Sequence, residues 1–191
     1  VYLSLPKEPL SETVPQNTQT HHPMPPAATK IVPDPAAIAQ LARMLEAASN
    51  PVIICQRCDS DGRLSEALST LAATHGIAVF EPFVLRNVLA SDDPALQGYH
   101  ASGPNGADLI IVLDSDTPWI EATNAPDQET IVVHIGPDPH FARMRVRGFR
   151  TDLAISSDPV EAILALHKQA SAPLAAPQRY ATLSQSAIER R

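Results

Sequence analysis

Two cysteines three positions apart, Cys55 and Cys58, are the residues in this sequence whose spacing most directly suggests chemistry. A C-x-x-C turn between a strand and a helix is typical of thiol–disulfide oxidoreductases, in which a helix N-terminus or a nearby cation lowers the pKa of one thiol. Arg57 would supply that cation. Against this function, Cys55 ends the apolar run 52–55, where cysteine usually serves as a small buried hydrophobe. The following helix is also expected to begin only near Gly62. A free-standing thiol–disulfide oxidoreductase or nucleotide-binding protein that uses this turn is therefore kept as the alternative hypothesis.

Histidines and the single tryptophan are weaker candidates. His21 and His22 are adjacent, but no cysteine or acidic residue lies at ligand spacing, so we interpret them as solvated residues rather than as a metal site. Trp119 follows Pro118, and we predict a packing anchor there in preference to a platform that stacks on adenine.

A cluster of arginines lies late in the chain, at Arg143, Arg145, Arg147 and Arg150. Guanidinium groups clamp phosphates and other anions, and they also pair with carboxylates across interfaces. Because the chain is acidic elsewhere, we favour the interface over the anion clamp.

The elements that must position these residues follow a regular pattern. Asp34-Pro35 and Asp158-Pro159 each predict a helix start, with aspartate as the cap and proline at the first helical position. The helical spacing of apolar residues also predicts a helix over 62–75, which Gly76 ends.

Short apolar runs at 52–55, 77–80, 109–113 and 131–135, and a weaker one at 153–155, predict strands that are buried on both faces. Strands of this kind that alternate with helices form a parallel sheet. The predicted fold class is therefore α/β, a Rossmann-like three-layer sandwich with a mostly parallel sheet of five or six strands. Ligands of such sheets bind beyond the carboxyl ends of the strands, which directs attention to residues 56–62, 114–116 and 136–139.

Composition and charge exclude several classes of function. The chain has 191 residues, 44% of them hydrophobic, which suffices for one domain with a core. A net charge of −7 argues against a nucleic-acid partner. We found neither an apolar run long enough to span a membrane nor a signal peptide. Two cysteines are too few for a secreted disulfide framework, so a cytoplasmic location is expected.

Two proline-rich stretches divide the chain. Residues 1–10 begin with the alternating pattern of a strand, and residues 11–33 read as a linker without regular secondary structure. Residues 34–170 form the predicted Rossmann-like domain, and residues 171–191 a second linker with a polar tail that could be a frayed helix. A long linker after a first edge strand is uncommon within a domain, so we interpret residues 1–10 as the end of a preceding domain.

The order of several motifs resembles thiamine-diphosphate-dependent enzymes of the acetolactate synthase and benzoylformate decarboxylase group. The motifs are "VYLSLP", "NPVIICQRC", "LAATHGIAVFEP", "ADLIIVLDSD", "IVVHIGPDP" and "AISSDPVEAILAL". The resemblance implies that residues 34–170 are the central domain of a homo-oligomeric enzyme acting on a 2-keto acid. The preceding domain would bind the pyrimidine of the cofactor and the following domain its diphosphate.

The resemblance also implies where the cofactors lie. Thiamine diphosphate and magnesium would be held by an acidic residue of the first domain and a Gly-Asp-Gly…Asn motif of the third. This sequence contains no Gly-Asp-Gly, so we expect no catalytic residue, no metal ligand and no thiamine chemistry in this chain.

In some relatives the central domain holds FAD or ADP. The corresponding positions here are Gln56, Arg57, Cys58, Asp114, Ser115 and Asp138. Side chains stand where Gly-x-Gly would let a pyrophosphate approach the backbone, and Asp114 with Asp116 would repel phosphates. We therefore expect a vestigial site and disfavour bound FAD or ADP.

Overall fold

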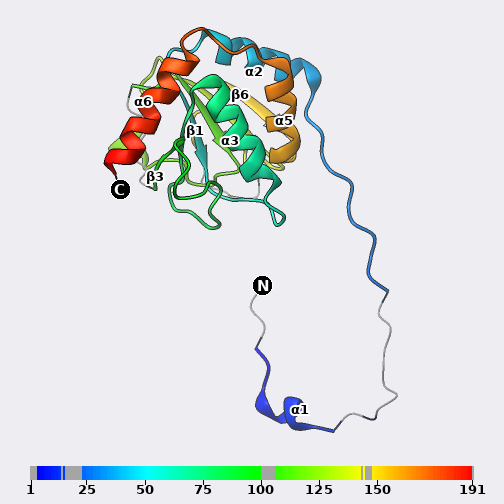
Figure 1. The fold of residues 1–191 in the computed structure, drawn as a ribbon. Coiled ribbons are helices and arrows are strands. Elements are labelled where there is room, and N and C mark those ends of the chain that lie inside the picture. The colour runs from blue at the N-terminus through cyan, green and yellow to red at the C-terminus, as the bar shows by residue number, and fades with distance from the viewer. Residues whose placement is uncertain are drawn as a thin grey trace.

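The computed structural model describes residues 4–13, 15, 23–99, 106–142, 144 and 148–190. Its centre is a six-stranded sheet in the order β3-β2-β1-β4-β5-β6, in which every neighbouring pair is parallel (Figure 1). The strands are β1 (Pro51–Cys55), β2 (Ala78–Phe80), β3 (Leu96–Gly98), β4 (Leu109–Leu113), β5 (Ile131–Gly136) and β6 (Leu153–Ser156). The predicted fold class is confirmed. Strand β3 was not predicted, because its three residues are too few to show an apolar run or an alternation of apolar and polar residues.

Two helices begin, and a third ends, at the residues that the sequence singles out. Helix α2 (Pro35–Ala47) and helix α5 (Pro159–Gln169) are capped by the carboxylates of Asp34 and Asp158, which accept backbone N–H groups of the first turn. Helix α3 (Arg63–His75) ends at Gly76, whose φ of +64° is the left-handed conformation that glycine adopts without strain.

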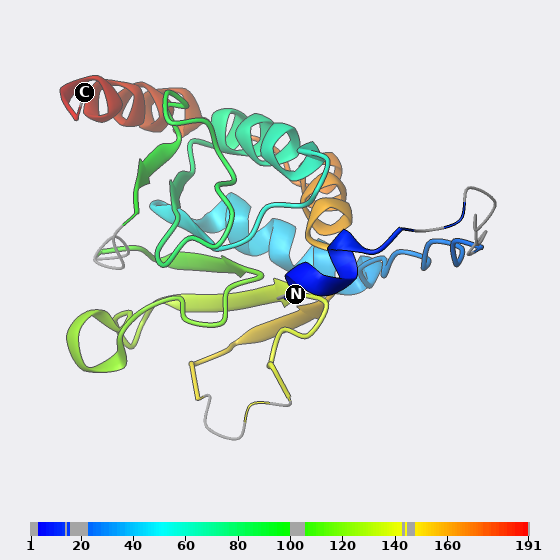
Figure 2. The same cartoon turned by 90° about the horizontal axis from the view of Figure 1, so that it is seen from below.

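The two faces of the sheet are covered differently. Helices α2, α3 and α5 bury one face in the larger apolar cluster, and Figure 2 shows these helices on one side of the strands. The other face packs against the segments that connect β4, β5 and β6, which include the short helix α4 (Glu121–Asn124). Trp119 lies at the centre of that second cluster, fully buried and edge-on to Phe149 with the ring centroids 5.2 Å apart. Its predicted role as a packing anchor is confirmed.

Helix α6 (Ala176–Glu189) follows the second proline-rich stretch and packs on α3 and β3. Arg179 donates to the carbonyl oxygens of Ala48, Ser49 and His75, at the carboxyl ends of α2 and α3. Arg190 donates to the Leu96 carbonyl of β3. The polar tail is thus a helix attached to the domain at both of its ends, while its assignment to an interdomain linker stays a prediction.

The amino-terminal part contains a one-turn helix, α1 (Lys7–Ser11), which the sequence did not predict. Residues 4–6 are not part of a strand, and the rest of the predicted first strand lies outside the described residues. Residues 23–33 have no regular secondary structure and leave the body as an extended arm (Figure 1). The arm joins the domain where the Ile31 carbonyl accepts from Asp158 N–H at 2.8 Å. Within the described residues, no helix combines the length and the apolar character needed to cross a bilayer.

Candidate functional site: the switch point between β1 and β4

Strand order reverses between β1 and β4, because the chain adds β2 and β3 on one side of β1 and β4, β5 and β6 on the other. The loops that leave two such strands diverge and open a crevice at their carboxyl ends. Here those loops are residues 56–62 and 114–120. The structure therefore places Gln56, Arg57 and Asp114 at the position where this architecture binds ligands.

Two side chains of the first loop cross this crevice. Arg57 donates to the Asp114 carbonyl at 2.9 Å and to a carboxylate oxygen of Asp116 at 2.8 Å. Gln56, almost fully buried, accepts from Asp116 N–H at 3.1 Å and donates to the Phe83 carbonyl at 3.1 Å. The loops after β1, β2 and β4 are thus cross-linked by these two residues.

The loop after β5 reaches the same place through Phe141. The Arg57 guanidinium lies over the Phe141 ring, 5.8 Å from its centroid. Asp138, in the same loop, accepts from Ala142 N–H and so shapes the turn that carries Phe141. Asp138 therefore influences the crevice by fixing the loop that positions Phe141. Ser115, the other predicted candidate, is buried next to Asp114 in the sequence.

Asp114 has an unusual backbone and an unusual environment. Its φ of +42° lies in the left-handed region, which costs energy for a residue other than glycine, although aspartate tolerates it better than most. Burial raises the pKa of the Asp114 carboxyl; Arg57 opposes this shift and the charge of Asp116 adds to it. One guanidinium therefore compensates two acidic side chains in a half-buried position.

The amino end of α3 is occupied by a carboxylate of the chain itself. Gly62 precedes the helix and has no side chain to cap it, and Asp59 takes that role by accepting from the backbone N–H groups of Arg63 and Leu64, both at 3.1 Å. Burial acts to raise the pKa of Asp59, but hydrogen bonds from Asp61, Leu64, Cys58 and Arg63 outweigh it and lower the pKa. In dinucleotide-binding folds these N–H groups hold a pyrophosphate.

Such a pyrophosphate does not fit the residues present. It would have to displace the Asp59 carboxylate from the amino end of α3 and approach Asp114 and Asp116. Among the cations nearby, Arg57 is already engaged by β4-loop oxygen atoms and Arg86 donates to the Asp59 carbonyl.

The cysteines do not have the properties of a redox pair. Cys55 is fully buried in β1, and burial raises the pKa of its thiol far above the ordinary value. Burial, followed by the neighbouring Asp59, raises the pKa of Cys58 to about 11. Cys58 donates its thiol proton to Asp59, at 3.2 Å, and a backbone hydrogen bond from Ser65, in the first turn of α3, lowers the thiol pKa without outweighing burial and Asp59. Because nucleophilic thiols need lowered pKa values, the alternative hypothesis of a thiol–disulfide oxidoreductase is not supported.

Other predicted candidates lie apart from the crevice. Arg150 donates to the carbonyl oxygens of Asp127 and Thr130 and pairs with Asp152, so it fastens the loops at the start of β5 and β6. Arg143, Arg145 and Arg147 lie outside the described residues, as do His21 and His22.

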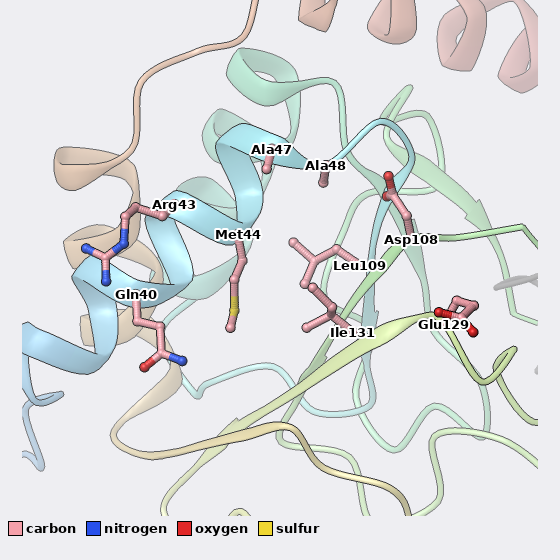
Figure 3. A pocket seen from close by; sticks show the side chains of 9 residues that line it. All are labelled: Gln40, Arg43, Met44, Ala47, Ala48, Asp108, Leu109, Glu129 and Ile131. Atoms are coloured by element: carbon pink, nitrogen blue, oxygen red, sulfur yellow. The ribbon is translucent and has the colours of Figure 1, made fainter.

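A hollow of about 480 Å³ opens at the opposite, amino edge of the sheet (Figure 3). Its lining residues are Gln40, Arg43, Met44, Ala47, Ala48, Asp108, Leu109, Glu129 and Ile131. The Asp108 carboxylate accepts from the N–H groups of Ser49 and Asn50 at 2.6 and 2.9 Å, and so serves to hold the α2–β1 turn. None of the candidates drawn from the sequence lies here.

Two residues of the crevice escaped the sequence analysis. Asp59 caps α3 from outside the usual cap position, and its only signal is an acidic residue close before a helix that starts with glycine. Phe141 has no signal in the sequence, because only the fold brings the β5 loop under Arg57.

Comparison with solved structures gives matches to thiamine-diphosphate-dependent enzymes. A protein of Mycobacterium smegmatis described as a thiamin diphosphate-dependent enzyme superposes with a TM-score of 0.66 at 18% identity, over 78% of this chain and 30% of that one. Benzoylformate decarboxylase from Polynucleobacter necessarius gives a TM-score of 0.61 at 21% identity, over 81% and 31%. The 4-hydroxybenzoylformate decarboxylase of Rhodococcus jostii RHA1 gives 0.64 at 17% identity, over 81% and 30%. The present chain thus spans about a third of the length of these enzymes, and at such identities the likeness establishes the fold.

A comparison with curated proteins gives no match. Among protein families, the model for the central domain of thiamine pyrophosphate enzymes matches residues 38–166, from α2 to the last turn of α5, and this span contains the whole sheet and the crevice between β1 and β4. The chain therefore belongs to the family of thiamine pyrophosphate enzyme central domains.

Proposed function

We propose that this chain is a non-catalytic central domain of an enzyme that decarboxylates or joins 2-keto acids, and that its own side chains take the place of a nucleotide at the switch point. The observation that carries the second part is the Asp59 carboxylate on the amino end of α3, next to the Arg57 link between β1 and β4. Both groups stabilise the crevice without a ligand.

The residues present do not fit thiamine diphosphate and its magnesium ion. The sequence has no Gly-Asp-Gly, and the described residues contain no group of three side chains suited to bind a metal ion. We propose that the cofactor and the groups that act on the substrate belong to pyrimidine- and diphosphate-binding domains of the parent enzyme, which would be a homo-oligomer. Two of the solved relatives are benzoylformate-type decarboxylases, which supports a 2-keto acid as the substrate class.

An activity assay tests the non-catalytic role. The purified chain is incubated with thiamine diphosphate, magnesium and either pyruvate or benzoylformate, and carbon dioxide release is followed. We expect release at the rate of the protein-free control. Turnover proportional to the concentration of the chain would show that it carries catalytic groups of its own.

Calorimetric titration with FAD, ADP and NAD tests whether the side chains in the crevice take the place of a nucleotide. We expect no dissociation constant of about 10 μM or tighter, which corresponds to about −7 kcal/mol. The variant Asp59→Ala/Asp116→Asn removes two of the carboxylates that a pyrophosphate would meet, and should bind ADP at least about tenfold more tightly than the natural chain, a difference of about 1.4 kcal/mol. Tight binding by the natural chain would refute the proposal.

A further inference from the structure

Two histidines, one buried and one half-buried, lie where three helices end, on the helix-covered face of the sheet. His75 is the last residue of α3 and has no exposed surface, and His167 lies in the last turn of α5. Their rings meet edge to face, with the centroids 6.3 Å apart. Among the described protein atoms, neither ring nitrogen of His75 has a hydrogen-bond partner, and Nδ1 of His167 has none.

Helix α6 packs on the end of α3 that carries His75. Arg179 donates to the His75 carbonyl at 2.6 Å and to the Ala48 carbonyl at 2.8 Å, which places its guanidinium at the carboxyl ends of α3 and α2. The contact between the helices is close: a Cβ built on Gly76 would lie 2.6 Å from the Ala176 carbonyl oxygen and 2.8 Å from Cβ of Arg179. Helix α6 therefore lies tightly against the end of α3 that carries His75.

The charged groups around His75 come from every helix packed there. Burial lowers the pKa of His75, and the charges of His167 on α5 and Arg179 on α6 lower it further, while Glu46 on α2 acts in the opposite direction. The Glu46 carboxylate is itself occupied by Ser171 N–H at 2.8 Å. The positive charge of Arg179 is compensated in part by the carboxylate of Asp108, just before β4. A proton on His75 would thus place a second buried positive charge beside the guanidinium that holds α6.

We propose that His75, packed edge to face against His167, forms an acid-sensitive latch that keeps α6 on the domain while the His75 ring is neutral and releases α6 when that ring is protonated. Undocking is the response that solvates the imidazolium and separates it from Arg179, since α6 is the element that carries the guanidinium. The carboxyl end of α3 then favours the charged His75 ring, because the helix dipole attracts cations there.

Hydrogen exchange of the 191-residue chain at pH 7.5 and pH 5.5 tests the latch, with rates expressed as protection factors. A histidine held neutral below its ordinary pKa of about 6.5 weakens the docked state as the pH falls, because the undocked state binds the proton. At pH 5.5 we expect the protection of amides 176–189 to be lower by up to about tenfold, a limit set by that ordinary pKa. Amides of α3 and α5 should keep their protection.

Three variants make the test specific. His75→Leu should abolish the pH response of α6, and His75→Gln, which keeps a neutral polar side chain, should do the same if the leucine variant does not fold. His140→Leu, at an exposed histidine in the β5–β6 connection, should leave the response unchanged. Arg179→Met should release α6 at both pH values.

An α6 protection factor that does not change between the two pH values would overturn the proposal. So would an unchanged pH response in His75→Leu, or an equal loss of protection in α3, α5 and α6, which indicates general acid unfolding.

Discussion

Replacing Arg57 with methionine removes the cation that links β1 to β4 while keeping an unbranched apolar stem over Phe141. The ion pair with Asp116 is half-buried, with 28% and 23% of the two side chains exposed. Its loss should therefore cost more than the roughly 0.2–1 kcal/mol of a surface pair and less than the roughly 3–5 kcal/mol of a buried one. With the hydrogen bond to the Asp114 carbonyl and the cation–π interaction with Phe141 also lost, we expect a destabilisation of about 1.5–2.5 kcal/mol at pH 7.5.

The pH dependence of this loss follows from Asp114. Its pKa is already raised by burial, so its contribution to stability is present at low pH and declines as the pH rises through the folded-state pKa. Arg57 opposes that shift, so the variant should raise the pKa further. The difference between natural chain and variant should accordingly shrink from pH 7.5 to pH 4.5. Asp114→Asn, which tolerates the left-handed backbone and carries no charge, should restore about 1 kcal/mol to the Arg57→Met variant.

Denaturant unfolding followed by the fluorescence of Trp119, the only tryptophan, measures these free energies. For a chain of this size the loss corresponds to a fall in Tm of roughly 3–10 °C. The reasoning fails if Arg57→Met lies within about 0.3 kcal/mol of the natural chain at pH 7.5, a difference typical of a neutral surface change. It also fails if Asp114→Asn brings no recovery.

Further predictions concern the helix ends and the thiols. Asp59→Ala should lower the free energy of unfolding, measured with denaturant, by about 1 kcal/mol, because the cap of α3 is lost. Asp61→Ala removes only a surface ion pair with Arg63 and should cost less than half of that. Equal effects would contradict the capping role of Asp59. Gly62→Ala and Gly76→Ala both force alanine into positive φ, which should lower the free energy of unfolding by about 1 kcal/mol each. Gly76→Ala should lose at least about 1 kcal/mol more, because its new Cβ would collide with α6 whereas that of Gly62→Ala meets nothing. Similar melting temperatures for the two variants would disprove the close packing of α6. Cys58, with its pKa raised to about 11, should react with iodoacetamide about a thousandfold more slowly at pH 8 than its thiolate does, and fast alkylation at pH 8 would contradict the geometry.

The fold was predictable because its signals are local. Proline after a capping aspartate fixes the start of α2 and α5, and a wholly apolar run of four or five residues identifies a strand buried on both faces. Strand β3 lacks such a signal, because it exists through pairing of Leu96 with Val79. The attachment of α6 was equally hidden, since Arg179 stabilises it through carbonyl groups that only the folded chain brings together.

The site was predictable in position and not in its contacts. Parallel strands end at one edge, so Gln56 to Cys58 and Asp114 to Asp116 had to lie near one another. Which atoms meet depends on side-chain direction, and the sequence does not state that Arg57 turns to the β4 loop. The absence of Gly-x-Gly was the reason to expect a vestigial site, and whether any nucleotide binds there stays a prediction.

The all-parallel sheet has a consequence for how this chain acquires its structure. None of the six described strands pairs with its neighbour through a hairpin. Ile53 of β1 lies opposite Val79 and Ile111, so the central strand needs partners from far along the chain. Loop-closure entropy must be overcome before such contacts become favourable, so topology of this kind slows folding relative to helical bundles. Refolding should therefore occur in milliseconds to seconds, and helix formation detected by circular dichroism should precede the burial of Trp119, which needs β4 and β5 together.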